Sequence, residues 1–98
     1  MRIEYGDERL SRICTAEAHK LGLPIAVTRQ AQKKLIQMEQ APDERTLRNW
    51  KSLNYKKLSG DREGQRSVKI NDQYRIVFEL LEDERPPAIR ILEIDDIH

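Results

Sequence analysis

The residues with the clearest potential for acid–base chemistry stand at the end of the printed sequence, which reads Asp95-Asp96-Ile97-His98. They follow residues 89–94, an apolar run typical of a core strand. The unperturbed pKa of a histidine lies closest to neutrality among the side chains, which suits His98 to proton transfer. Neighbouring carboxylates, including that of a chain terminus, favour its charged form. A polar tail without function is the alternative interpretation, and the spacing alone favours it.

The same residues also carry atoms that bind metal ions, so a metal-dependent hydrolase using Asp95, Asp96 and His98 is an alternative hypothesis. The only other histidine, His19, falls in a different predicted element. The sequence contains no paired cysteines, no Walker loop and no dinucleotide-binding glycine motif. We therefore predict no metal site and no cofactor.

Positive charge is concentrated in the middle of the chain. Residues 29–75 hold twelve basic and six acidic side chains, whereas residues 76–98 hold two basic and seven acidic ones. A basic region of this kind can face nucleic-acid phosphates, and a solvated surface is the alternative. Arg75 alternates with Tyr74 and Ile76, so its side chain is predicted on the opposite face of its strand. The facing of Arg66 stays open, because the sequence does not fix strand register.

The helices that must position these residues follow from hydrophobic periodicity. Apolar residues at helical spacing predict an amphipathic helix over 7–20 that Gly22 ends. A second helix is predicted to begin at Pro24 and to end before Ala41, because Pro42 disfavours a helical conformation at the preceding residue. A short helical turn is expected at 46–50, with Trp50 and Leu53 pinned to the core.

The rest of the chain changes to the period of two that strands show. The predicted strands and turns are 3–5, 67–70, a two-residue hairpin turn at Asn71-Asp72, 74–81, a turn at 82–87, and 88–95. Two helices followed by hairpins predict a single α+β domain over residues 1–98. Its two N-terminal helices should pack on one face of a small, mainly antiparallel β-sheet and leave the other face partly open.

Composition sets the remaining bounds. A chain of 98 residues has room for one domain, and 38% hydrophobic against 36% charged residues predicts a thin core. The single cysteine, Cys14, excludes an internal disulfide and suits a reducing compartment. No apolar stretch approaches the roughly 20 residues that span a bilayer, and residues 1–5 lack the apolar core of a signal peptide. We expect a cytoplasmic protein without a membrane partner.

Residues 58–78 read LSGDREGQRSVKINDQYRIVF. This segment closely resembles the signature of HigB-type toxins of the RelE superfamily, which runs from a Gly-Asp-Arg motif to an Arg-Ile pair in the next strand. The ending Glu93-Ile94-Asp95-Asp96-Ile97-His98 is similar to the family's terminal motif. The resemblance covers about residues 22–98, and the two motifs together are specific.

The resemblance implies the toxin half of a toxin–antitoxin pair, which cuts messenger RNA on the 70S ribosome without a metal. A ribose 2′-hydroxyl would attack the adjacent phosphate and leave a cyclic phosphate. The partner would be a helix-turn-helix (HigA-like) antitoxin, through which the toxin would reach operator DNA indirectly.

The resemblance also implies roles for single residues. His98 would transfer a proton or orient the 2′-hydroxyl, and Asp96 would orient His98 or share the role of base. Arg75 and Arg66 would stabilise the phosphate as charge develops. The residues expected to hold RNA are Lys57, Arg62, Lys69 and Asn71.

Three positions depart from the family pattern. Ile97 stands where the family has a tyrosine, Ser59 where some members have a lysine, and Tyr74 where a tryptophan is usual. Loss of the tyrosine would remove a base-stacking surface. A slow toxin, or a catalytically silent module that only binds the ribosome or an antitoxin, is therefore the alternative hypothesis.

Overall fold

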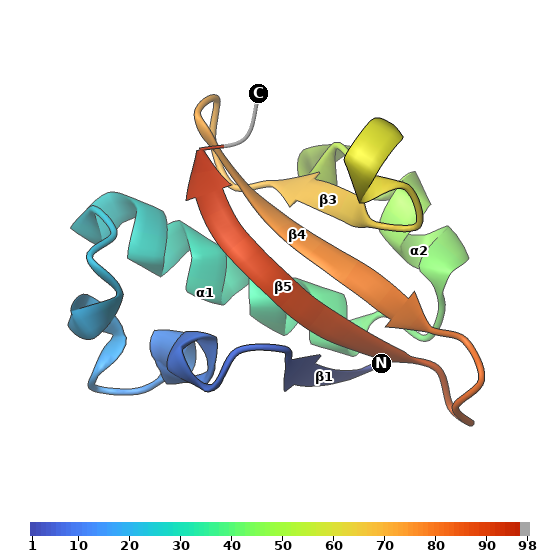
Figure 1. Cartoon of the computed structure of the whole chain (residues 1–98), viewed down its shortest axis with the longest axis horizontal. Coiled ribbons are helices and arrows are strands. Elements are labelled where there is room, and N and C mark those ends of the chain that lie inside the picture. The colour runs from blue at the N-terminus through green and yellow to red at the C-terminus, as the bar shows by residue number, and fades with distance from the viewer. Residues whose placement is uncertain (97–98) are drawn as a thin grey trace.

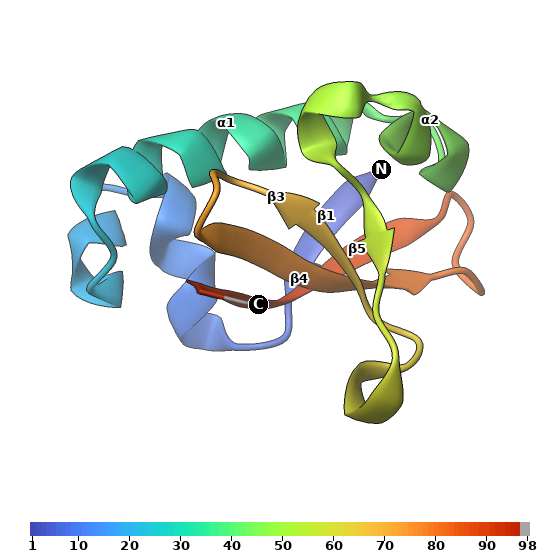
Figure 2. The same cartoon turned by 90° about the horizontal axis from the view of Figure 1, so that it is seen from above.

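The computed structural model describes residues 1–96, in which two α-helices cover one face of a five-stranded sheet (Figure 1; Figure 2). The helices are α1 (Ile25–Gln40) and α2 (Glu44–Asn49), and the strands are β1 (Arg2–Tyr5), β2 (Lys56–Lys57), β3 (Arg66–Lys69), β4 (Tyr74–Leu81) and β5 (Ala88–Asp96). Short 3-10 helices fill the connections: η1 (Glu8–Cys14), η2 (Ala18–Leu21), η3 (Lys51–Leu53) and η4 (Gly60–Arg62).

The sheet has the order β1-β5-β4-β3-β2. Strand β1 runs parallel to β5 at one edge, and all other neighbours are antiparallel. This arrangement confirms the predicted α+β fold with a mainly antiparallel sheet. Val77 lies opposite Glu93 and the next residue, Phe78, lies opposite Ile91. The intervening Leu92 therefore forms a bulge in β5, which increases the local twist of the sheet.

Helix α1 has the predicted bounds and the predicted buried stripe. Its buried residues are Val27, Ala31, Leu35 and Met38. Pro24 precedes its first turn, where a missing N–H costs no helical hydrogen bond. Ala41 adopts an extended conformation (φ −71°, ψ 131°) before Pro42, which ends the helix for the steric reason that the sequence indicates.

The prediction of one amphipathic helix over 7–20 is wrong. The segment forms the two 3-10 helices η1 and η2, with an extended Thr15 after the first. The Thr15 hydroxyl donates to the carbonyl of Arg12 at 2.7 Å, an alternative bond that competes with helix propagation. Leu10 and Ile13 are both buried, and a spacing of three residues suits the three-residue turn of a 3-10 helix. Gly22 ends η2 in the left-handed conformation (φ 73°), as predicted.

The hairpin between β3 and β4 is longer than the predicted two-residue turn. Residues 70–73 separate the strands, and the side-chain Oδ1 of Asn71 accepts from the N–H groups of Gln73 (2.8 Å) and Tyr74 (2.7 Å). This is the local bond by which asparagine replaces backbone pairing in a turn. The loop is therefore held by a side chain.

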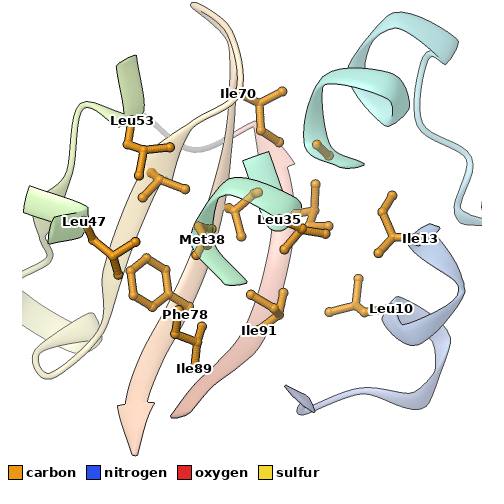
Figure 3. Packing of buried hydrophobic residues seen from close by; sticks show 14 of the residues in the cluster. Leu10, Ile13, Leu35, Met38, Leu47, Leu53, Ile70, Phe78, Ile89 and Ile91 are labelled. Carbon is orange, nitrogen blue, oxygen red and sulfur yellow. The ribbon is translucent and has the colours of Figure 1, made fainter. Parts of the chain in front are cut away.

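The core lies between α1 and the sheet and continues to both sides (Figure 3). Phe78 and Ile91 from the sheet pack with Met38 of α1, and each is fully buried. Leu53 is fully buried and Trp50 is partly buried against the cluster, as predicted. Burial of each large apolar side chain contributes about 1.5–3 kcal/mol, which fixes the sheet against the helices.

The opposite face of the sheet is not bare. Ser67 and Val77 are cross-strand partners, and both are fully buried, although strand alternation directs them away from α1. Figure 2 shows η4 on this side of the sheet, away from α1 and α2. The chain from Asn54 through β2 to η4 reaches this side of the sheet, and a cleft lies beside it (Figure 2).

Candidate nucleic-acid interface

A cleft of about 320 Å³ opens on the sheet face away from the helices, at the β2–β3 edge. It is lined by Asn54, Lys56, Leu58, Ser67, Lys69, Asn71, Asp72 and Arg75. Three of these side chains are cationic and one is anionic, so the cleft carries net positive charge. A polyanion fits this lining better than a neutral ligand does.

Arg75 is held at the cleft by neutral oxygen atoms. Its Nε donates to the Ser67 hydroxyl at 2.8 Å, and its Nη2 donates to the carbonyl of Asn54 at 2.6 Å. Asn54 has a left-handed backbone (φ 44°) after η3, a conformation that asparagine tolerates better than most residues. These two bonds fix the guanidinium without neutralising its charge.

Within residues 1–96, Arg75 forms no ion pair. Burial lowers its pKa, yet a guanidinium stays charged at neutral pH. A partly buried cation without a counter-ion is costly, and an anion in the cleft would remove that cost. The predicted facing of Arg75, away from the core face of its strand, is confirmed by its place in the cleft lining.

Arg66 lies on the other face of the same hairpin. It is the cross-strand partner of Phe78, whose side chain is in the core, and its Nε donates to the Glu44 carboxylate of α2 at 2.9 Å. Tyr55 also donates to Glu44 and packs edge-on to Phe78 with ring centroids 6.1 Å apart. The structure therefore does not bring Arg66 together with Arg75.

The electrostatics of this group confirm that it is internally neutralised. Burial opposes the charge of Arg66, but Tyr55 and Glu44 outweigh it and hold the pKa of the guanidinium above its ordinary value. Burial likewise opposes the charge of Glu44, while the bonds from Tyr55 and Arg66 lower the pKa of that carboxyl. We call these three residues the Glu44 network. The positive charge of Arg66 and the negative charge of Glu44 neutralise each other, so the network offers little net charge to a ligand.

The two lysines of β2 fall on different faces. Lys56 is the cross-strand partner of Ser67 and lines the cleft, whereas Lys57 is the partner of Arg66 and is exposed on the other side. The sequence reasoning selected Lys57 and missed Lys56. Only the pairing with β3 distinguishes them, because a two-residue strand shows no alternation of its own.

Of the other predicted RNA-binding residues, two line the cleft and one does not. Lys69 lines the cleft, but its Nζ lies 2.8 Å from the exposed carboxylate of Asp72. Asn71 also lines the cleft, although its side-chain oxygen is occupied in the hairpin turn. Arg62 lies outside the lining and pairs with Glu93 of β5 at 2.9 Å, which ties η4 to the sheet.

The end of β5 lies next to the strand of Arg75, whose cross-strand partner is Asp95. Asp96 is the cross-strand partner of Tyr74, on the other face of the sheet from Arg75. The exposed Asp96 accepts from the side-chain amide of Gln73 at 3.0 Å, so the hairpin loop contacts the last residue of β5. The predicted catalytic residue His98 and the departure at Ile97 lie outside the described residues.

Residues 1–96 contain no cluster of three metal-binding side chains. Among their helices, none combines the length and apolar content needed to cross a membrane.

Comparisons with known proteins agree with this architecture. Residues 3–88 match the family described as RelE-like toxin of type II toxin-antitoxin system HigB. No curated protein matches the chain in sequence.

Solved structures share the fold at low sequence identity. The YoeB/ParE toxin from Agrobacterium tumefaciens superposes with a TM-score of 0.61 at 12% identity, with 100% of each chain covered. YafQ from E. coli strain BL21(DE3) gives 0.58 at 15% identity, covering 98% of this chain and 93% of its own. The YoeB-YefM complex from Staphylococcus aureus gives 0.57 at 13%, covering 100% and 98%.

Proposed function

The chain belongs to the RelE-like toxins of the HigB type II toxin–antitoxin system, and we propose that it is a ribosome-dependent endoribonuclease that cuts messenger RNA. The observation that carries the proposal is the state of Arg75. Its guanidinium is fixed by Ser67 and Asn54, has no counter-ion within residues 1–96, and faces a cationic cleft. A phosphodiester would supply the missing anion.

The proposed reaction is attack of a ribose 2′-oxygen on the adjacent phosphorus. The O–P bond forms, the bond to the 5′ oxygen breaks, and a cyclic phosphate remains. Negative charge grows on the non-bridging oxygens, where donors already in place stabilise it most. Arg75 has donors fixed at the cleft for this purpose, and Lys56 and Lys69 would hold the flanking phosphates. No step requires a metal or another cofactor.

Two proton transfers complete the proposed reaction. One group takes the proton of the 2′-hydroxyl and another gives a proton to the departing 5′ oxygen. We assign these steps to His98, as the proton-transfer group, and to Asp96, which would orient it. The end of β5 lies beside the strand of Arg75, with Asp95 as the cross-strand partner of that arginine, which supports a site shared by both strands. Arg66 is better suited to stabilising the hairpin than to contacting the phosphate.

We further propose a single domain over residues 1–98 that acts in the cytoplasm with an antitoxin partner. The similar S. aureus toxin is present in a complex with YefM, which supports a protein partner for this chain. We expect that partner to be a helix-turn-helix, HigA-like protein, through which the complex would bind operator DNA. The 70S ribosome would present the messenger RNA.

The test uses messenger RNA bound to 70S ribosomes, with a single 2′-deoxy nucleotide placed at the mapped cleavage position. We expect the ribose form to be cut and the deoxy form to resist. His98→Ala should abolish both cleavage and growth arrest, whereas the matched His19→Ala, at an exposed position, should change neither.

Three results would overturn parts of this proposal. Growth arrest without any cleavage would identify a silent binding module, the alternative that Ile97 and Ser59 favour. Arrest by His98→Ala as strong as that by the unmodified protein would remove the catalytic assignment of His98. Cleavage of the deoxy form would exclude attack by the 2′-oxygen.

A further inference from the structure

One side of α1 borders two neighbouring hollows at the β1 edge of the molecule. The first, of about 390 Å³, lies between α1, η1 and β1 and is lined by Tyr5 and Ile36 among others. The second, of about 470 Å³, lies between α1 and η2 and is lined by His19 and Ile25 among others. Gln32 lines both, so the two hollows adjoin, and we call them together the α1 groove.

The α1 groove presents apolar side chains to solvent. Ile25 is 73% exposed and Ile36 is 55% exposed. Within residues 1–96, these two are the exposed large hydrophobic residues. Eleven positions of helix separate them, which returns to the same face after three turns and spans about 16 Å. The two isoleucines lie beside the apolar side chains that line the two hollows, and an exposed apolar surface with a polar rim is typical of an interaction site. The amide of Gln32 between them donates to the carbonyl of Ile13 at 2.7 Å, which fixes η1 against the helix.

Charge beside the groove selects the chemistry of the partner. Arg29 lines the groove one turn from Ile25, and Lys33 lies one turn further along α1. Both are exposed, and neither forms an ion pair within the described part of the chain. The N-terminus of α1, at the Ile25 end, adds the partial positive charge of a helix dipole. Glu39 lines the hollow at the Ile36 end, so the positive charge is concentrated at the Ile25 end. A complementary partner carries its carboxylates there, next to its apolar residues.

We propose that the α1 groove binds an amphipathic helix of the antitoxin. Its apolar residues would contact Ile25 and Ile36, and its acidic residues would face Arg29 and Lys33. A helix of about three turns matches the span between the isoleucines, and anchors at every third or fourth residue are the usual pattern for such docking. This inference rests on the proposed function, since the antitoxin is the partner expected of a type II toxin.

The position of the groove separates inhibition from catalysis. The groove borders β1, and the Arg75 cleft borders β2 and β3, which are at the opposite edge of the sheet. A helix seated in the groove therefore does not cover the cleft. Variants of the groove should lose antitoxin binding and keep the toxic activity, which makes the two surfaces separable by experiment.

The probe is the purified product of the reading frame adjacent to the toxin gene, titrated into the purified toxin by calorimetry. Ile25→Glu combined with Ile36→Glu should raise the Kd about 100-fold, because two central anchors are lost and two charges are introduced. The matched control combines Asn49→Glu and Ser52→Glu, which add the same charge at exposed positions in α2 and η3, outside the lining of the groove. In cells, the groove variant should arrest growth and escape neutralisation.

Each remaining outcome contradicts the proposal in its own way. Binding of the groove variant within threefold of the unmodified toxin would show that the antitoxin docks elsewhere. Unchanged binding together with loss of a toxin dimer in light scattering would identify the groove as a contact between copies. If the adjacent protein fails to neutralise even the unmodified toxin, the antitoxin premise fails. Loss of ribosome-dependent cleavage by the groove variant would show that the groove and the cleft are not separable surfaces.

Discussion

Two arginines on one hairpin show how the surroundings of a side chain decide its use. Arg66 and Arg75 lie on adjacent antiparallel strands, and both are partly buried. Arg66 points to the helix side and meets the carboxylate of Glu44. Arg75 points to the cleft and meets only neutral oxygens of Ser67 and Asn54 among residues 1–96. The same side chain is thus neutralised on one face and left charged on the other.

This difference shows that the role of a basic residue, in stability or in ligand binding, can be inferred only when its interaction partner is known. A paired guanidinium contributes to stability, and breaking the pair leaves a charge that is costly to bury. An unpaired guanidinium that is fixed in place is ready for a ligand. The two arginines should therefore respond to mutation in opposite ways, one in activity and the other in stability.

The largest expected effect is that of Arg75→Ala on catalysis. Loss of a fixed donor at a charge that develops in the transition state lowers rates about 100- to 1,000-fold. We expect this fall in the single-turnover rate on ribosome-bound messenger RNA, with the midpoint of thermal unfolding changed by only a few degrees. Arg75→Lys should recover part of the rate, because it restores the positive charge. The recovery should be incomplete, because lysine lacks the two bonds that fix the guanidinium to Ser67 and Asn54.

An exposed arginine supplies the control for this experiment. Arg48→Ala removes a cation from the polar side of α2 and should leave the rate within about twofold. An equal loss of rate in both variants would mean that Arg75 acts only through the general positive field, and the contrast with Arg66 would lose its basis.

The next largest effect is that of Arg66→Ala on stability. It removes a charge-assisted bond and leaves Glu44 partly buried with Tyr55 as its remaining hydrogen-bond donor. We expect the free energy of unfolding to fall by about 2 kcal/mol, measured by chemical denaturation. The cleavage rate per folded molecule should change little. A rate loss as large as that of Arg75→Ala, in protein of normal stability, would restore the catalytic role that the family resemblance implies for Arg66.

Much of the fold could be predicted because its signals are local. The stripe of α1, the proline before it and Pro42 after it are all sequence features with a direct steric consequence. The segment 7–20 failed because the three-residue spacing of Leu10 and Ile13 suits both kinds of helix, and the bond of Thr15 to Arg12 favoured the shorter ones. Periodicity alone cannot separate those outcomes.

The cleft was less predictable because its residues are brought together by pairing between strands. Alternation within β4 correctly placed Arg75, yet the side of Arg66 depends on register with β4 and on Glu44, which lies 22 positions earlier. Lys56 and Lys57 differ only in their partners on β3. Such information resides in tertiary contacts, and the chain order of the residues does not contain it.

A smaller effect is expected in the pH dependence of the unfolding free energy, which tests the pairing of Arg66 with Glu44. The folded pKa of Glu44 lies below its ordinary value of 4.5. As pH falls toward that value, the unfolded chain takes up the proton first, so the stabilisation by Glu44 is present above pH 4.5 and is lost as pH falls through the folded pKa. The contribution should be under about 1 kcal/mol, because solvent screens this partly exposed group. Glu44→Gln should flatten the decline of unfolding free energy below pH 4.5.

The matched control for the titration is Glu63→Gln. Glu63 is exposed in the turn after η4, so its replacement should leave the pH dependence unchanged. If the unfolding free energy of both variants falls with pH as steeply as that of the unmodified protein, other carboxylates dominate acid unfolding. In that case the contacts of the Glu44 network do not contribute to the pH dependence of stability.

The smallest effect concerns Lys69, which stands between the two extremes because it lines the cleft yet has a counter-ion. Its partner Asp72 is almost fully exposed, and the bond to Lys69 lowers the pKa of the Asp72 carboxyl. An exposed pair of this kind is weak, so phosphate can displace Asp72 from the lysine. Asp72→Asn should lower the KM for ribosome-bound messenger RNA by up to about threefold and leave kcat unchanged. Asp61→Asn, which removes the same charge at an exposed position outside the cleft lining, is the control. A change in kcat confined to Asp72→Asn would mean that Asp72 contacts the reacting groups, and Lys69 would then belong with Arg75.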